Sequence, residues 1–360
     1  MTPEPSRPPD PASGMTAVRY EYTSGLVPLL EQLNISLLVT TYQAGRLLAV
    51  GTHQGTISIG FHNFEQVMGL AVKPDCIAVG TRRQIWLLWS APALAPRVET
   101  VGKHDGCFLT RSAHFTGPVH GHELAWGDGD LWLVNTLFSC LCTLREEFSF
   151  VPRWRPPFVT AWAPEDRCHL NGLALDGGRP RYVTLLAETD TAAGWRPNKA
   201  TTGCVYDVMR NEPVVRGLCM PHSPRLSEGR LWVLNSGRGE LALVDTRAKR
   251  AEAVATLPGY TRGMDLFGRY VFIGLSRIRE TAVFGGLPIA ERRQELCCGV
   301  AVVDCHTGQQ VAGLRFHSGV EEIFEVKVLA GVRCPVVSGP LPDIDGSDHI
   351  WLVPEPQPLS

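Results

Sequence analysis

The sequence predicts an all-β fold, a six-bladed β-propeller closed by pairing of strands from the two ends of the chain. Three observations support this prediction. Strand–turn–strand patterns dominate the chain, helical periodicity is scarce, and the patterns recur within roughly the 40–50-residue period of propeller blades. One short amphipathic helix is expected, at residues 25–33. The 36 glycines and 27 prolines are ordinary for a protein built from many turns.

Five strand–turn–strand units are complete, and each opens with the inner strand of a blade. These units start near Val67, His122, His169, His222 and Thr261. Glycine and acidic residues mark the turns, as in HELAWGDGDLWLVN and HSPRLSEGRLWVLN. The Leu-Trp pair that both of these units contain is expected to fill the space between blades.

The sixth unit is split between the two ends of the sequence. SLLVTTYQAGRLLAVG lacks an earlier inner strand, and VEEIFEVKVL lacks a following blade. Joining the two segments closes a ring and removes two exposed sheet edges. A seven-bladed propeller, or a pair of β-sandwiches with a misjudged repeat, is the alternative. We expect a disordered Pro-rich leader at residues 1–18, one propeller domain at 19–340 and a short tail at 341–360.

Composition limits the classes of partner. The net charge of -2 comes from 34 basic and 36 acidic residues, with no basic stripe, so nucleic acid is not an expected partner. No apolar run reaches the ~18 residues of a membrane span, and the N-terminus lacks the features of a signal peptide. We therefore expect a cytoplasmic protein without membrane contact, whose 11 cysteines are mostly free thiols.

Histidines recur at the start of inner strands. Alignment of the units places His122 and His222 at the same position of two blades, and His169 close to that level in a third. His120 lies two residues before His122, and either ring could face the channel. Three neutral imidazoles from three blades would hold a divalent metal ion (zinc, copper or iron) with an open coordination position. The structural alternative is that each ring only hydrogen-bonds a neighbouring backbone group.

Charged residues expected at the same face complete the candidate site. Glu321 or Glu322 should arrive from the closing strand, and Glu322 or Glu188 is a candidate general base. Arg262 and Arg277 are candidates for binding an anionic group of a substrate, because the guanidinium fork matches a carboxylate. The polar loop AETDTAAGWRPNK is expected to add a tryptophan and an arginine to this face.

Two classes of function fit this pattern, and the remaining alternative is a protein without activity or ligand. The first is a metal-dependent active site at the channel mouth, with lyase, hydrolase or oxygenase chemistry on a small molecule or peptide. The second is a non-catalytic propeller that binds a peptide or protein on the same face. The third is an inert scaffold. The sequence has no Walker loop, no dinucleotide-binding glycine pattern and no G-x-S-x-G elbow.

Several motifs resemble those of a conserved bacterial protein family of unknown function that is predicted to form β-propellers. They are TTYQAGRLL, HELAWG, NTLFSCLCTL, SFVPRWRPPF, PEDRCHLNGLAL, MPHSPR, GYTRG and GLSRIRE, and they cover about residues 20–340. The resemblance implies the fold but no reaction, substrate or cofactor.

A more distant similarity is architectural. The lyase that cleaves peptidyl-α-hydroxyglycine is a six-bladed propeller with a zinc ion held by three histidines from separate blades. His122, His169 and His222 would suit that plan. The sequence shows no clear cysteine framework like that of the secreted lyase.

Overall fold

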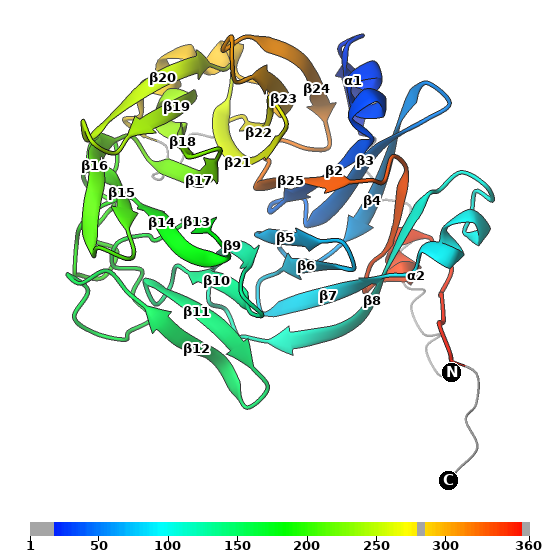
Figure 1. The fold of residues 1–360 in the computed structure, drawn as a ribbon, viewed down its shortest axis with the longest axis horizontal. Helices are drawn as coiled ribbons and strands as arrows, with labels where there is room; N and C mark the ends of the chain where they lie inside the picture. The colour runs from blue at the N-terminus through cyan, green and yellow to red at the C-terminus, as the bar shows by residue number, and fades with distance from the viewer. Residues whose placement is uncertain (1–17, 279–284, 355–360) are drawn as a thin grey trace, which may run out of the picture.

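Six small sheets surround a central channel, as Figure 1 shows in a view along the shortest axis of the molecule. This computed structural model describes residues 18–278 and 285–354. The arrangement confirms the predicted six-bladed β-propeller. The predicted leader at residues 1–18 lies outside the described residues, apart from Val18.

We number the blades in chain order around the ring and give the strands of each blade from the channel outward. Blade 1 contains β25 (Glu325–Ala330), β2 (Ile35–Thr41), β3 (Arg46–His53) and β4 (Thr56–Asn63). Blade 2 contains β5 (Leu70–Lys73), β6 (Cys76–Gly80), β7 (Gln84–Ser90), β8 (Gly106–Phe115) and β26 (Pro335–Ser338). Blade 3 contains β9 (Gly121–Trp126), β10 (Leu131–Asn135), β11 (Cys140–Arg145) and β12 (Phe148–Trp154).

The second half of the ring repeats this plan. Blade 4 contains β13 (Gly172–Asp176), β14 (Arg179–Leu185), β15 (Gly203–Asp207) and β16 (Glu212–Leu218). Blade 5 contains β17 (Pro221–Ser227), β18 (Arg230–Asn235), β19 (Glu240–Asp245) and β20 (Arg250–Thr256). Blade 6 contains β21 (Tyr260–Phe267), β22 (Tyr270–Ser276), β23 (Cys298–Asp304), β24 (Gln310–Ser318) and β1 (Arg19–Tyr22).

The ring closes within blade 1, as the split sequence unit predicts. Strand β25 pairs antiparallel with β2, from Ile35 opposite Ala330 to Thr40 opposite Glu325. Two further strands, which the sequence did not reveal, tie the chain ends to other blades. β1 pairs antiparallel with β24, and β26 lies parallel to β8. Both segments pair with the outermost strand of a blade and cover its open edge.

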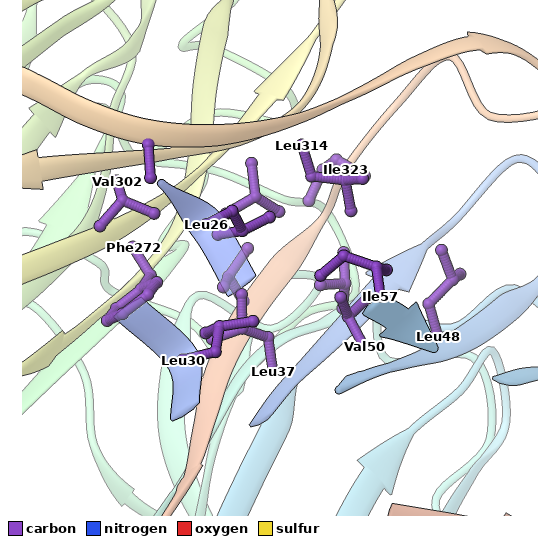
Figure 2. Close-up of a cluster of buried hydrophobic side chains, with 14 of the residues drawn as sticks. Leu26, Leu30, Leu37, Leu48, Val50, Ile57, Phe272, Val302, Leu314 and Ile323 are labelled. Carbon is purple, nitrogen blue, oxygen red and sulfur yellow. The ribbon is translucent and has the colours of Figure 1, made fainter. Parts of the chain in front are cut away.

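The expected helix packs across the junction between blades 6 and 1. Helix α1 (Leu26–Leu33) is followed by its C-cap residue Asn34, which has a left-handed conformation with a φ of +53°. Leu26 and Leu30 are almost fully buried. Figure 2 shows them beside Leu37 of β2 and Phe272 of β22, within one apolar cluster. Burial of such a leucine contributes roughly 1.5–3 kcal/mol, so the helix helps to hold the closing junction.

The C-terminal segment also contacts blade 1. The short helix α2 (Pro342–Asp345) lies within the predicted tail at 341–360, of which residues 355–360 lie outside the described part of the chain. Oδ1 of Asp345 accepts hydrogen bonds from the backbone and side-chain amides of Asn63, at 2.8 and 2.6 Å. Part of this predicted tail therefore packs on β4.

Short helices complete the fold. The described part of the chain includes the 3-10 helices η2 (Pro92–Arg97), η3 (Ser236–Arg238) and η4 (Pro288–Glu295). Across residues 18–278 and 285–354, no helix has the length and apolar character that a bilayer crossing requires.

Candidate functional site

A cavity of about 430 Å³ opens at one mouth of the channel. It is called the mouth cavity below. Its polar lining consists of Gln43, His120, His122, Asp166, His169, Arg196, His222, Arg262 and Glu322. Its apolar and aromatic lining consists of Tyr42, Met68, Trp195, Met220, Tyr260 and Phe324. Polar groups that converge within apolar walls are typical of a small-ligand site.

His122 is anchored through its Nδ1 atom. This nitrogen lies 3.0 Å from the carbonyl oxygen of His120 and 2.8 Å from Oγ1 of Thr136. The Thr136 hydroxyl donates its own proton to the carbonyl of Leu170, at 2.6 Å. Because a carbonyl oxygen can only accept, Nδ1 of His122 carries the proton. Nε2 is then the atom with a free lone pair.

His222 repeats this arrangement in blade 5. Its Nδ1 atom lies 2.9 Å from the carbonyl oxygen of Met220 and 3.1 Å from Oγ of Ser236. In both blades the carbonyl belongs to the residue two positions earlier, and that residue has a positive φ of about 50°. The shared spacing of histidine and hydroxyl in HELAWGDGDLWLVNT and HSPRLSEGRLWVLNS therefore encodes the same anchored imidazole.

His169 is anchored by a carboxylate instead of a carbonyl. Its Nδ1 atom lies 3.1 and 2.9 Å from the two oxygens of Asp166. Asp166 also accepts a hydrogen bond from Nε1 of Trp195, at 3.0 Å. Sequence reasoning missed Asp166, although PEDRCHLNG places it three residues before the histidine. Its role depends on the positive φ values of Asp166 and His169, which bend this loop.

The three imidazole rings lie close enough to one another for His169 to affect the pKa of His122 and of His222. His122 and His169 lie edge to face with 4.9 Å between ring centroids. Burial lowers the pKa of both His122 and His222 well below the usual value, and nearby His169 and Arg262 lower it further. His122 and His222 are therefore neutral at pH 7, with their basic Nε2 atoms available to a ligand.

The rings as they stand do not form a complete metal centre. Over residues 18–278 and 285–354, no group of three or more His, Cys, Asp or Glu side chains is arranged to hold a metal ion. Metal binding by His122, His169 and His222 would thus require a different arrangement of these side chains.

Arg262 is placed in the cavity by a β-bulge. The pairing of β21 with β22 shifts register between Thr261 and Met264. Gly263 in this bulge has a φ of +74°, and a Cβ there would lie 2.5 Å from Cα of Glu325. Glycine thus permits β21 to approach β25 closely. The bulge brings the Arg262 guanidinium 3.4 Å from the ring centroid of Phe324.

Glu322 is the carboxylate that the closing segment brings to this cavity. Its Oε1 atom lies 3.7 Å from Nη1 of Arg262. It precedes β25, and Glu321 is not among the residues that line the cavity. The structure therefore selects Glu322 from the two alternatives left by the sequence.

His120 also lines the cavity, but its side chain is exposed at the rim, whereas the side chain of His122 lies deeper.

Two predicted site residues lie elsewhere. Glu188 pairs with Arg216 of β16, with 3.1 Å between Oε1 and Nη2. Arg277 donates from Nη2 to the carbonyl of Phe316 at 3.5 Å. Neither lines the mouth cavity. The loop that carries Glu188 instead contributes Trp195 and Arg196 to it.

A buried charge cluster lies deeper in the channel. We call Glu123, Arg225, Glu325 and Lys327 the channel belt. The side chains of the two glutamates are 3% exposed and those of the two cations 11–12%. Arg225 pairs with both glutamates. Lys327 lies 3.6 Å from Glu123 and 3.8 Å from Glu325.

The channel belt links inner strands to one another. Arg225 of β17 donates from Nε to the carbonyl of Met264 in β21, at 2.8 Å. Glu123 of β9 accepts from the backbone amide of Leu173 in β13, at 3.0 Å. Burial raises the pKa of Glu325 to about 7, and neighbouring Glu123 also raises it. Sequence reasoning missed this cluster, although charged residues interrupt the inner-strand segments HELAW, HSPRL and EVKVL.

The channel belt lies between two cavities. All its members except Glu325 line a second cavity of about 270 Å³, together with Asp265. His122, which precedes Glu123, and Phe324, which precedes Glu325, line the mouth cavity. The belt therefore separates the candidate site from the opposite end of the channel.

The anchored tautomers can be tested by nitrogen NMR of protein labelled at histidine. His122 and His222 are expected to show a protonated Nδ1 and an unprotonated Nε2, and His169 is expected to show a protonated Nδ1, because an oxygen acceptor lies at each Nδ1. His317 is a control, since its side chain is 41% exposed and its Nε2 lies 3.3 Å from Glu21. An unprotonated Nδ1 in any of the three cavity histidines would contradict the assigned hydrogen bonds.

The fold and the cavity define a six-bladed β-propeller with a polar site at the mouth of its channel. The chain belongs to the family described as Domain of unknown function (DUF4915), whose model matches residues 24–338. This confirms the resemblance to a family of unknown function. A search of curated proteins finds no match.

Two solved structures show the same fold. One, titled "Crystal structure of Nidogen/Laminin Complex", has a chain that matches with a TM-score of 0.54 and 9% identity, over 82% of this chain and 99% of that chain. The other is a protein of unknown function from Bacteroides caccae, with a TM-score of 0.51 and 9% identity, over 82% of this chain and 98% of that chain. At this identity the similarity concerns the fold alone.

Proposed function

We propose that the mouth cavity is an active site for a small molecule or peptide, and that His122, His169 and His222 bind a divalent metal ion there. The observation that carries the proposal is the shared anchoring of the three rings. Each Nδ1 donates to an oxygen acceptor, which leaves each Nε2 as the ligand atom. A hydrogen bond of this kind at the second ring nitrogen is typical of metal-binding histidines.

The metal would supply a Lewis acid that polarises a substrate oxygen or activates a water. Zinc, copper or ferrous iron could accept three imidazoles, so lyase, hydrolase and oxygenase reactions are all compatible with the ligand set. The chain itself would orient the substrate. Asp166 holds the His169 ring, and Arg262 offers a cation to an anionic group of the substrate. Glu322 is the candidate general base, because it lines the same cavity.

A non-catalytic ligand-binding propeller is the second candidate. It is favoured by the lack of a ready three-ligand group among the described residues. In that case the same face would bind a peptide or protein through Arg262 and the aromatic walls alone. We also propose a cytoplasmic location, supported by the 11 cysteines, all of which are free thiols in the structure.

Cobalt binding separates the two candidates. Metal-free protein titrated with Co²⁺ is expected to bind one ion per chain and to develop visible absorption bands of a cobalt–imidazole site. The variant with His122→Ala, His169→Ala and His222→Ala together should lose these bands. The matched control is His317→Ala, which removes an exposed histidine and should leave the titration unchanged.

Elemental analysis completes this test. Protein purified without a chelator or metal-binding tag should contain about one equivalent of zinc, copper or iron, given three strong ligands. Absence of stoichiometric binding by both native protein and added Co²⁺, or equal binding by the triple variant, would overturn the metal proposal. The non-catalytic reading would then stand.

A further inference from the structure

We propose that the ligand of the mouth cavity is a carboxylate attached to an apolar, aromatic-sized body, and that Glu322 occupies the carboxylate position when the ligand is absent. This inference rests on the proposed function, because it concerns the same cavity. It adds the substrate class and assigns Glu322 as an internal competitor for Arg262.

The two channel arginines differ in how well their charges are satisfied. Arg225 pairs with two carboxylates and donates hydrogen bonds to backbone carbonyls, among them those of Met264 and Pro224, both at 2.8 Å. Arg262 has one ion pair, to Glu322 at 3.7 Å, and its guanidinium donates no hydrogen bond to any described residue. Arg225 is therefore a structural cation, whereas Arg262 keeps its donors for another acceptor.

The environment of Arg262 makes such an acceptor favourable. Its side chain is 15% exposed and stacks on Phe324. Burial lowers the pKa of Arg262, as expected for a cation removed from water without full compensation. A guanidinium presents parallel N–H groups that match the two oxygens of a carboxylate. The distance of 3.7 Å shows that Glu322 approaches this fork without forming a hydrogen bond to it.

The walls of the cavity indicate what the carboxylate is attached to. Four aromatic side chains and two methionines face the same space, namely Tyr42, Trp195, Tyr260, Phe324, Met68 and Met220. An apolar body gains free energy by leaving water for such walls, at roughly 25 cal/mol per Å². A cavity of about 430 Å³ has room for a ring and a short chain.

Charge balance supports one anionic group. The cavity lining contains two arginines, Arg196 and Arg262, and two carboxylic side chains, Asp166 and Glu322. A divalent ion on the histidines would add two positive charges, which a ligand carboxylate would partly offset. If the ligand displaces Glu322 from Arg262, this side chain can accept a proton or bind another group of the ligand.

Calorimetric titration with a series of probes tests the inference. The series is butyrate, hexanoate, benzoate and phenylpropionate, each compared with its neutral amide. Phenylpropionate is expected to bind best among the carboxylates. Its amide should bind about tenfold more weakly or worse, because hydrogen bonds to charged groups contribute roughly 1.5–3 kcal/mol. If none of the carboxylates binds, or if the amides bind equally well, the inference fails.

Variants assign the carboxylate to Arg262. Arg262→Met should weaken phenylpropionate binding by about tenfold or more and leave amide binding unchanged, while Arg262→Lys should retain part of the affinity. Glu322→Gln should strengthen carboxylate binding, because the internal competitor loses its charge. Arg179→Met is the matched control at an exposed surface arginine. Thermal unfolding of each variant checks that the fold is intact.

The result is separable from the metal proposal. Co²⁺ binding by the unaltered protein with no preference for carboxylates over amides would refute the substrate class and leave the metal site standing. If carboxylates bind in a way that depends on Arg262 but Co²⁺ does not bind, the metal proposal is refuted and the proposed class of ligand is supported. An unchanged preference for carboxylates in Arg262→Met would overturn the assignment of this residue.

Discussion

Replacement of Arg225 by methionine is expected to lower the free energy of unfolding by about 3–5 kcal/mol, the range for breaking a buried ion pair by removal of one partner. Arg225 lies between Glu123 and Glu325, whose side chains are both 3% exposed. Methionine retains much of the apolar stem but leaves two buried carboxylates with Lys327 as their shared cation. Urea unfolding followed by tryptophan fluorescence measures the loss.

The loss should depend on pH. Burial already raises the pKa of Glu325 to about 7 in the native protein, and removal of Arg225 should raise it further. The folded variant would then hold a proton that the unfolded chain, with an ordinary glutamate pKa, releases. Stability of the variant should therefore fall more steeply than that of the native protein as pH rises from about 5 to about 8.

The control for Arg225 is Arg179→Met. Arg179 is 76% exposed and pairs with Asp128, which is 58% exposed. An exposed pair of this kind contributes about 0–1 kcal/mol, so the control should change stability little. Equal losses in the two variants, or a loss at Arg225 that does not vary with pH, would contradict the role assigned to the channel belt.

Truncation after Ser318 is expected to abolish cooperative folding. The deletion removes β25, which pairs with six successive residues of β2 and forms the inner strand of blade 1. It also removes Ile323, Glu325 and Val326, all buried, and leaves Leu37 and Val39 at an open edge. The lost interactions should exceed the roughly 5–15 kcal/mol by which a domain is stable.

Near-ultraviolet circular dichroism and thermal scans measure this effect. The truncated chain should show no sharp transition and should aggregate. The matched control is a chain truncated after Pro354. It keeps every residue that the structure describes, so it should unfold like the full chain. A peptide of residues 319–340 added to the truncated chain should restore part of the transition. A cooperative transition in the truncated chain alone would show that closure by β25 is dispensable.

The sequence allowed the ring to be predicted because its information is local. Each hairpin carries alternating apolar residues and a turn signal within about 15 residues, and a closed ring of blades follows when the incomplete units at the two ends are joined. Repetition also revealed that His122 and His222 share one position. Their Nδ1 anchors, the backbone carbonyls two residues earlier and the hydroxyls of Thr136 and Ser236, obey the same repeat.

Which side chains from distant segments meet in the cavity could not be predicted from such local patterns. Glu188 and Glu322 had equal standing in the sequence, but only Glu322 lines the mouth cavity. The bulge at Gly263 directs Arg262 into the cavity, while Arg277 lies outside it. No local pattern separates these pairs, since each outcome depends on where a neighbouring blade places its backbone.

The sequence by itself determined the number of blades, the closing strand pair and the level of the histidines, because strand periodicity and turns act over short distances. Tertiary structure decided which charged groups meet. Arg225 and Glu325 are 100 residues apart in the chain, yet they form one ion pair in the channel belt. Asp166 orients His169 only because a bent loop returns its carboxylate to the ring. Such pairings arise when the ring closes, since closure brings the inner strands of separate blades within reach of one another.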